Sequence, residues 1–199
     1  MKILLAKRRA MGDTVLLSST VDLVKNSIPG AEISVVVPGA FAPLLKNHPS
    51  IKNIWHAEES WLSLLPRIRA ERFDHFFQLH ASPSQKWLGR LSGAKVRHFH
   101  QQNAETEKAY GKHPHALEWD AFHLAAELPN VAFGRAPPPR IFLSEEEVAA
   151  GKSFWRRHGV DPAKVIFLGL GASRQPKRWP HFARFAELLR DRMEAVPAI

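Results

Sequence analysis

The sequence predicts an α/β fold with a doubly wound parallel sheet, because short apolar, β-branched runs alternate with segments of helical periodicity. The first run, Lys2–Ala6, opens the chain, and a helical pattern follows it after a short turn. A second observation is the three prolines at 137–139, which fix a stiff, extended connector. We therefore expect two domains, 1–136 and 137–199, although a surface crossover within one domain would also explain the prolines.

The first strand and helix are joined by a basic turn that ends in a glycine–aspartate pair. Lys7, Arg8 and Arg9 follow the strand, and Gly12 and Asp13 stand at the start of the helix. Glycine permits a backbone conformation that a side chain would hinder, and a carboxylate is favourable beside the unpaired N–H groups of a helix start. Asp13 is therefore either only an N-cap or a functional carboxylate at the carboxyl end of the strand, where open α/β sheets bind ligands.

The remainder of the N-terminal part continues this alternation. Proline and glycine mark the ends of its elements, as at Pro38–Gly39, and Trp61, Leu64 and Ile68 share one helical face. The expected strands are 31–37, 51–56, 73–79 and 95–99, and the expected helices are 41–47, 61–70, 86–91 and 115–128, the last after a polar loop at 101–114.

The C-terminal part begins with a helix signal and continues with one strand–loop–helix unit. Ser144 and Glu147 have the spacing of a capping box, which predicts a helix that starts there. Residues 165–168 have the composition of a buried strand, and a helical pattern covers 181–193.

The loop between that strand and helix has the composition of a phosphate-binding turn. The backbone amide at Gly171, the hydroxyl of Ser173 and the ammonium of Lys177 are suited to hold an anion. The bare pattern fits a plain strand–helix loop equally well, because neither the Walker spacing nor G-x-G-x-x-G is present.

Composition limits the possible partners. The formal net charge of +9 favours an anionic partner, although the scattered Lys and Arg residues also serve solubility alone. The absence of cysteine excludes disulfides and thiolate zinc sites, and the pairs His98/His100 and His113/His115 lack a third metal ligand. We expect a soluble, cytoplasmic protein without a nucleic-acid partner, because no membrane-spanning run and no nucleic-acid-binding motif is found.

Two stretches stand out, Lys2–Lys7 with Met11-Gly12-Asp13, and Gly171-Ala172-Ser173 with Lys177-Arg178-Trp179-Pro180. Both resemble the family 9 glycosyltransferases, the lipopolysaccharide heptosyltransferases. A weaker likeness lies at 73–95, where Gln78 and His80 stand in place of the acidic residue and the Gln that are usual in the family. Another lies at His115 and Glu118, a pair that a helix start also explains.

The resemblance implies a GT-B-like protein, with an N-terminal Rossmann-like acceptor-side domain and the beginning of a second Rossmann-like, nucleotide-sugar-binding domain. It implies that Asp13 is the catalytic base and that Gly171, Ser173 and Lys177 bind the donor phosphates. Lys7 and Gly12 are weaker candidates for acceptor binding. The implied reaction transfers a heptose or related sugar from a nucleotide-diphosphate sugar to the lipopolysaccharide core at the membrane surface. No metal or cofactor is implied, and we expect a monomer that is cytoplasmic or peripheral on the inner face of the inner membrane.

The resemblance ends one strand and one helix into the donor domain, at about residue 193. We therefore expect either a fragment or a natural truncation with impaired activity. The alternatives are a non-catalytic remnant or binding domain and, with less support, a nucleotide-binding oxidoreductase. The last would require G-x-G-x-x-G after the first strand, which the sequence lacks.

Overall fold

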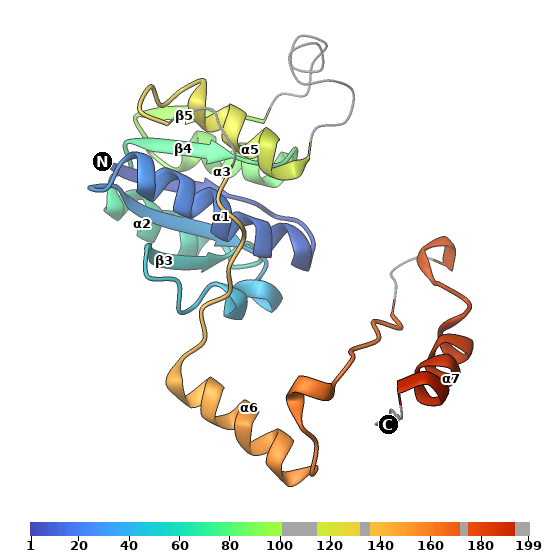
Figure 1. The fold of residues 1–199 in the computed structure, drawn as a ribbon. Coiled ribbons are helices and arrows are strands. Elements are labelled where there is room, and N and C mark those ends of the chain that lie inside the picture. The colour runs from blue at the N-terminus through green and yellow to red at the C-terminus, as the bar shows by residue number, and fades with distance from the viewer. Residues whose placement is uncertain (101–114, 132–135, 172–174, 194–199) are drawn as a thin grey trace. The chain divides into compact units, whose positions relative to one another are not determined.

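The computed structural model describes residues 1–100, 115–131, 136–171 and 175–193. Its centre is a parallel sheet of five strands in the order β3-β2-β1-β4-β5 (Figure 1). The predicted doubly wound α/β fold is thereby confirmed for the N-terminal part. The strands are β1 (Lys2–Ala6), β2 (Glu32–Val37), β3 (Ile51–His56), β4 (His75–Gln78) and β5 (Val96–His98).

Helices cover both faces of this sheet, so the central strand is buried on both sides. α1 (Met11–Ser27) and α5 (Ala116–Ala125) pack on one face, and α2 (Trp61–Glu71) and α3 (Pro83–Leu91) on the other (Figure 1). Along β1 the side chains alternate between the two apolar cores, with Ile3 on the α1 side and Leu4 on the α2 side. The expected helix at 41–47 is instead the 3₁₀ helix η1 (Gly39–Leu44), which contains Pro43. None of the described helices is long and apolar enough to cross a bilayer.

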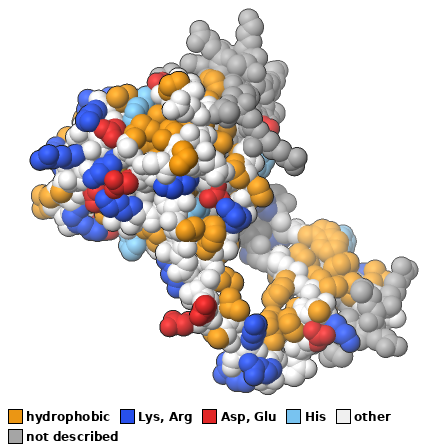
Figure 2. Space-filling model, turned by 60° about the vertical axis from the view of Figure 1, so that its left-hand side comes forward, with side chains coloured by type: hydrophobic (Ala, Val, Ile, Leu, Met, Phe, Trp, Pro, Cys, Tyr) orange, Lys and Arg blue, Asp and Glu red, His pale blue; other side chains and the backbone are white. Residues whose placement is uncertain are grey.

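The chain divides into two compact units, Met1–Ser144, which contains the sheet, and Glu145–Ile199. The predicted strand at 165–168 is wrong, because the described residues of this unit contain no strand with which it could pair. Phe167 is 79% exposed, and apolar side chains reach the surface of this unit (Figure 2). Its elements are α6 (Glu145–Arg157), η2 (Pro162–Lys164), η3 (Gln175–Lys177) and α7 (Phe182–Met193).

The proline connector is bonded to the first unit, and we call residues 137–142 the strap. The strap belongs to the first of the two compact units, which ends at Ser144. Three polar side chains of α1, those of Ser18, Ser19 and Asp22, are buried where they form hydrogen bonds with the strap. The hydrogen bonds run from Ser19 Oγ to the Pro137 carbonyl, from the Arg140 N–H to Ser18 Oγ (2.9 Å), from the Arg140 guanidinium to Asp22 Oδ2 (2.8 and 3.2 Å), and from Asn47 Nδ2 to the Phe142 carbonyl (3.1 Å).

Replacing Asp22 with asparagine is expected to loosen the strap. The Asp22 side chain is only 8% exposed and accepts two hydrogen bonds from Arg140, so the variant loses a charge-assisted pair. Trypsin should then cleave after Arg140 roughly tenfold faster, since cleavage requires local opening of the strap. Timed digestion with mass spectrometry measures this, and cleavage after Arg157 in the second unit is the internal control. Equal rates after Arg140 in both proteins would show that the Asp22 pair does not hold the strap.

Candidate active site

The carboxyl ends of β1 and β4 form the edge of the sheet where a ligand is expected. These strands are neighbours, yet the chain leaves β1 into α1 on one face and β4 into α3 on the other (Figure 1). At such a reversal the two loops turn towards opposite faces of the sheet, and open α/β sheets bind their ligands at this point. The loops also contact each other, because Arg8 Nη1 donates to Ser84 Oγ at 3.0 Å. With its amide assigned to satisfy both donors, Gln85 accepts from the backbone N–H groups of Lys7 and Arg8 at 3.2 and 2.6 Å.

Asp13 lies at this edge, in the first turn of α1. The helix begins at Met11, and its cap residue is Ala10, which makes no side-chain cap hydrogen bond. The alternative that Asp13 is only the N-cap is therefore wrong. Its side chain is 18% exposed, and Oδ2 lies 3.6 Å from Nε of Arg9. A ligand hydroxyl can reach this carboxylate, which is what a proton acceptor requires.

Gly12 is exposed and helical, and it does not have a positive φ angle. A Cβ added there would meet no atom within 4 Å. The expectation that the backbone needs glycine at this position is therefore wrong. An acceptor-binding role for Gly12 stays a prediction.

Lys7 does not present its ammonium to the edge, although the sequence made it an acceptor-binding candidate. Its side chain is 2% exposed, and Nζ forms an ion pair with Asp120 Oδ2 on α5. Thr20 Oγ1 on α1 donates to the same oxygen at 2.9 Å. Because this ammonium is already bound to a buried carboxylate, Lys7 lacks the exposed cation on which the predicted acceptor-binding role depends. Burial raises the pKa of Asp120, and the Lys7 ammonium opposes that rise.

Sequence reasoning missed Asp120, although the sequence contained a signal for it. Leu117, Asp120, Ala121 and Leu124 have the spacing of one helical face, on which Asp120 is the only charged residue. The structure buries Asp120, Ala121 and Leu124 together. A charged side chain on an apolar stripe needs a partner, which here lies 113 residues away in the chain.

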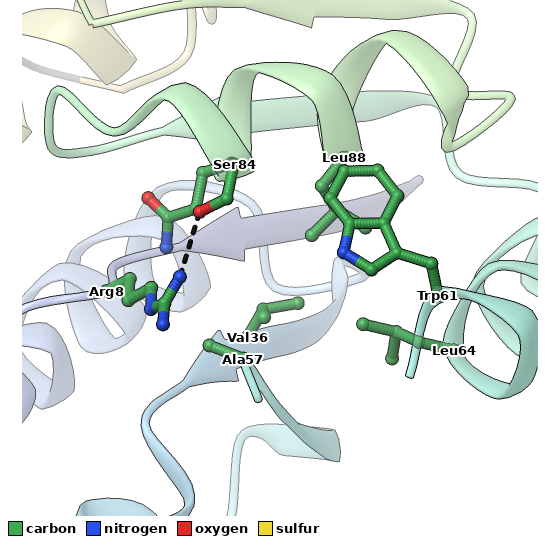
Figure 3. A pocket seen from close by; sticks show the side chains of 8 residues that line it. Arg8, Val36, Ala57, Trp61, Leu64, Ser84 and Leu88 are labelled. Atoms are coloured by element: carbon green, nitrogen blue, oxygen red, sulfur yellow. Dashed lines mark hydrogen bonds between the residues drawn. The ribbon is translucent and has the colours of Figure 1, made fainter. Parts of the chain in front are cut away.

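A small cavity opens beside the two loops (Figure 3). Its volume is ≈ 40 Å³, room for about three water molecules. Arg8 and Ser84 supply polar groups on one side, and the indole of Trp61 lies across from them (Figure 3). Val36 and Leu88 add apolar wall. The cavity can take a small polar substituent of a ligand that lies along the sheet edge.

Three histidines form a cluster: His80 and His100 follow β4 and β5, and His123 lies on α5. The His80 and His100 ring centroids are 6.2 Å apart, and those of His100 and His123 are 5.1 Å apart. Burial lowers the pKa of all three, to about 4 for His123, so they are neutral near pH 7. Among the described residues, no group of three His, Cys, Asp or Glu side chains is arranged to hold a metal ion. His80 occupies one of the departures from the family pattern, and the structure places it within the electrostatic reach of Asp13 and Arg9.

The buried histidines predict a loss of stability in acid. For His123 the pKa falls from 6.5 to about 4 on folding, so the unfolded chain binds more protons between these values. Its contribution is therefore complete above pH 6.5 and is lost as the pH falls towards 4. After a discount for solvent access, we expect a loss of roughly 2 kcal/mol.

Thermal melts of the wild-type chain and His123→Gln between pH 7.5 and 4 measure this difference. The variant should lose less stability than the wild type over this range. Parallel pH curves for the two proteins would contradict the expected contribution of His123.

The predicted phosphate-binding residues lie in the second unit. Gly171 and Lys177 are exposed, with Lys177 at the end of η3, and Ser173 lies outside the described residues. Their joint role stays a prediction. At the start of α5, the His115 N–H donates to a Glu118 carboxylate oxygen at 2.8 Å, and the Leu117 N–H donates to His115 Nδ1 at 3.3 Å. The helix-start explanation of the His115–Glu118 pair is therefore confirmed.

No family model and no curated protein matches this chain. Solved structures do match it. The glycosyl transferase family 9 protein from Veillonella parvula DSM 2008 gives a TM-score of 0.78 at 17% identity over 96% of this chain and 58% of that chain. The E. coli ADP-heptose lps heptosyltransferase II gives 0.69 at 20% identity over 98% and 62%. E. coli heptosyltransferase WaaC with ADP gives 0.61 at 19% identity over 96% and 65%.

These likenesses define the class of fold as that of GT-B-like glycosyltransferases. Within that class, the matching structures are family 9 and heptosyltransferase proteins, so the resemblance seen in the sequence is confirmed for the fold. The chain spans 58–65% of the length of these three structures.

Proposed function

We propose that the protein is a glycosyltransferase that moves a heptose or related sugar from a nucleotide-diphosphate sugar to the lipopolysaccharide core. The observation that carries the proposal is a partly exposed carboxylate, Asp13, at the point of the sheet where the winding direction changes. The fold likeness to heptosyltransferases supports it, and one of the matching structures contains ADP-2-deoxy-2-fluoro heptose.

Asp13 would act as general base. Its carboxylate accepts the proton of the acceptor hydroxyl while the hydroxyl oxygen bonds to the anomeric carbon and the bond to the diphosphate breaks. A hydroxyl approaching Asp13 would also lie near Arg9, whose side chain is 57% exposed and could orient anionic groups of the acceptor.

The donor phosphates would be bound by the second unit. We infer that Lys177, with Gly171 and Ser173, stabilises the charge that develops on the leaving diphosphate. Lys177 is exposed and thus accessible to a ligand. The net charge of +9 is consistent with two anionic substrates and with an acceptor at an anionic membrane surface.

The proposal is tested by incubating the full chain with radiolabelled ADP-heptose and heptose-deficient lipopolysaccharide core. We expect label to appear in the core oligosaccharide in proportion to time and protein. A folded chain that binds the core saturably but transfers no label would favour the alternative of a non-catalytic binding domain.

An oxidoreductase role has less support. The turn after β1 lacks the glycine spacing that lets a dinucleotide pyrophosphate approach a helix start. Fluorescence titration with NADH tests it directly, and we expect no saturable binding.

A further inference from the structure

The buried carboxylate of Asp120 joins the two ends of the segment that carries Asp13. One of its oxygens, Oδ2, receives the Lys7 ammonium and the Thr20 hydroxyl, the latter at 2.9 Å. Lys7 is the first residue after β1, and Thr20 lies in α1, beyond the first turns of that helix. We call Asp120, Lys7 and Thr20 the Asp120 clamp.

The turn before Asp13 is held on one side by Gln85 of α3, which accepts from the Lys7 and Arg8 N–H groups, but the contacts of Asp13 itself are weak. The α1 cap residue, Ala10, offers no side-chain hydrogen bond, and the pair between Asp13 and Arg9 is 3.6 Å long with an exposed guanidinium. The Thr14 N–H donates to the Ala10 carbonyl at 3.2 Å, which starts the helix but does not tie it to another element. The clamp ties both the turn and the helix to α5, whereas Gln85 bonds the turn alone.

Stability alone does not explain a buried ion pair at this place. Two charges removed from water cost desolvation energy, and apolar residues of similar volume often stabilise a core as well or better. A hydrogen-bonded ion pair also fixes the orientation of its side chains, because both donors must point at the same oxygen. The side chains of Lys7 and Asp120 are 2% and 3% exposed, and Thr20 is 2% exposed. Solvent therefore does not compete for these hydrogen bonds.

We propose that Asp120 is a positioning residue that sets the place of Asp13 at the sheet edge through Lys7 and Thr20. This inference rests on the proposed function for its catalytic consequence. The positional part stands on the geometry of the clamp alone.

Two variants test the clamp, Thr20→Val, which removes one hydroxyl at nearly constant shape, and Asp120→Asn, which removes the charge. Asp74→Asn is the matched control, since Asp74 also accepts from an N–H (Lys2, 2.8 Å) and a lysine (Lys95, 2.6 Å), but at the amino ends of the strands. Amide hydrogen exchange by NMR should be roughly tenfold faster at Thr14 in both clamp variants, the effect of one lost hydrogen bond, and unchanged in the β1–β4 ladder. The control should leave Thr14 unchanged.

The same proteins are assayed for transfer. We expect both clamp variants to lower kcat while the KM for the donor stays within about twofold, because positioning of the base does not alter donor binding. Exchange at Thr14 that does not rise, or rises equally in Asp74→Asn, overturns the clamp. If exchange behaves as expected but the wild-type chain transfers no sugar, the proposed function fails and the positional role of Asp120 stands. If Asp120→Asn does not fold, Thr20→Val decides.

Discussion

Replacing Asp13 with asparagine is expected to lower kcat of sugar transfer by roughly 10²- to 10⁴-fold, the range found for removal of a general base. The amide keeps the shape of the side chain but cannot accept the proton of the attacking hydroxyl. Because Asp13 is not the N-cap of α1 and its side chain reaches solvent, the fold should remain intact. The donor KM should change little, since the loss falls on the transition state.

Transfer rates with saturating labelled donor measure this effect, with circular dichroism as the test of folding. Asp74→Asn is the control, because its carboxylate sits at the amino edge of the same sheet in an exposed pair with Lys95. Equal kcat in Asp13→Asn and the wild type would remove Asp13 from the chemistry.

Replacing Asp120 with alanine is expected to lower the free energy of unfolding by about 3–5 kcal/mol. The change leaves the ammonium of Lys7, whose side chain is 2% exposed, without its carboxylate inside the core. It also opens space between α5 and α1, and it removes the acceptor of Thr20. For comparison, Lys95→Ala at the exposed pair with Asp74 should cost less than about 1 kcal/mol.

Urea unfolding of both variants measures the difference. The double variant Lys7→Met with Asp120→Leu should recover most of the lost stability, because it removes both charges and fills the space with apolar atoms. A single Asp120→Ala change that costs no more than Lys95→Ala would contradict the buried pair.

The central strands β1, β2 and β4 were predictable because each lies in a short, largely apolar run, and turn residues bound β2. β2, for example, combines three consecutive valines with a Pro-Gly stop, and it is buried almost throughout. The run at 165–168 has the same local character, yet it forms no strand. A strand depends on hydrogen bonds to a neighbour, and local composition does not reveal whether that neighbour exists.

The site was predictable only in part, for a similar reason. Asp13 follows from local sequence, since strand, turn and helix start are adjacent in the chain. The burial of Lys7 does not, because it depends on Asp120 in a helix 113 residues away. A lysine in a basic turn is usually exposed, so charge and position suggested a free ammonium where the structure has a bound one.

We propose that the acceptor binds at the carboxyl edge of β1 and β4, beside Asp13. Chemical-shift mapping of the ¹⁵N-labelled chain with heptose-deficient core oligosaccharide tests it most directly, and it does not require turnover. We expect saturable shifts at Arg9, Gly12, Asp13 and His80, with little change at Asp74 and Lys95 at the opposite edge. Shifts confined to that opposite edge, or none at saturating oligosaccharide, would contradict it.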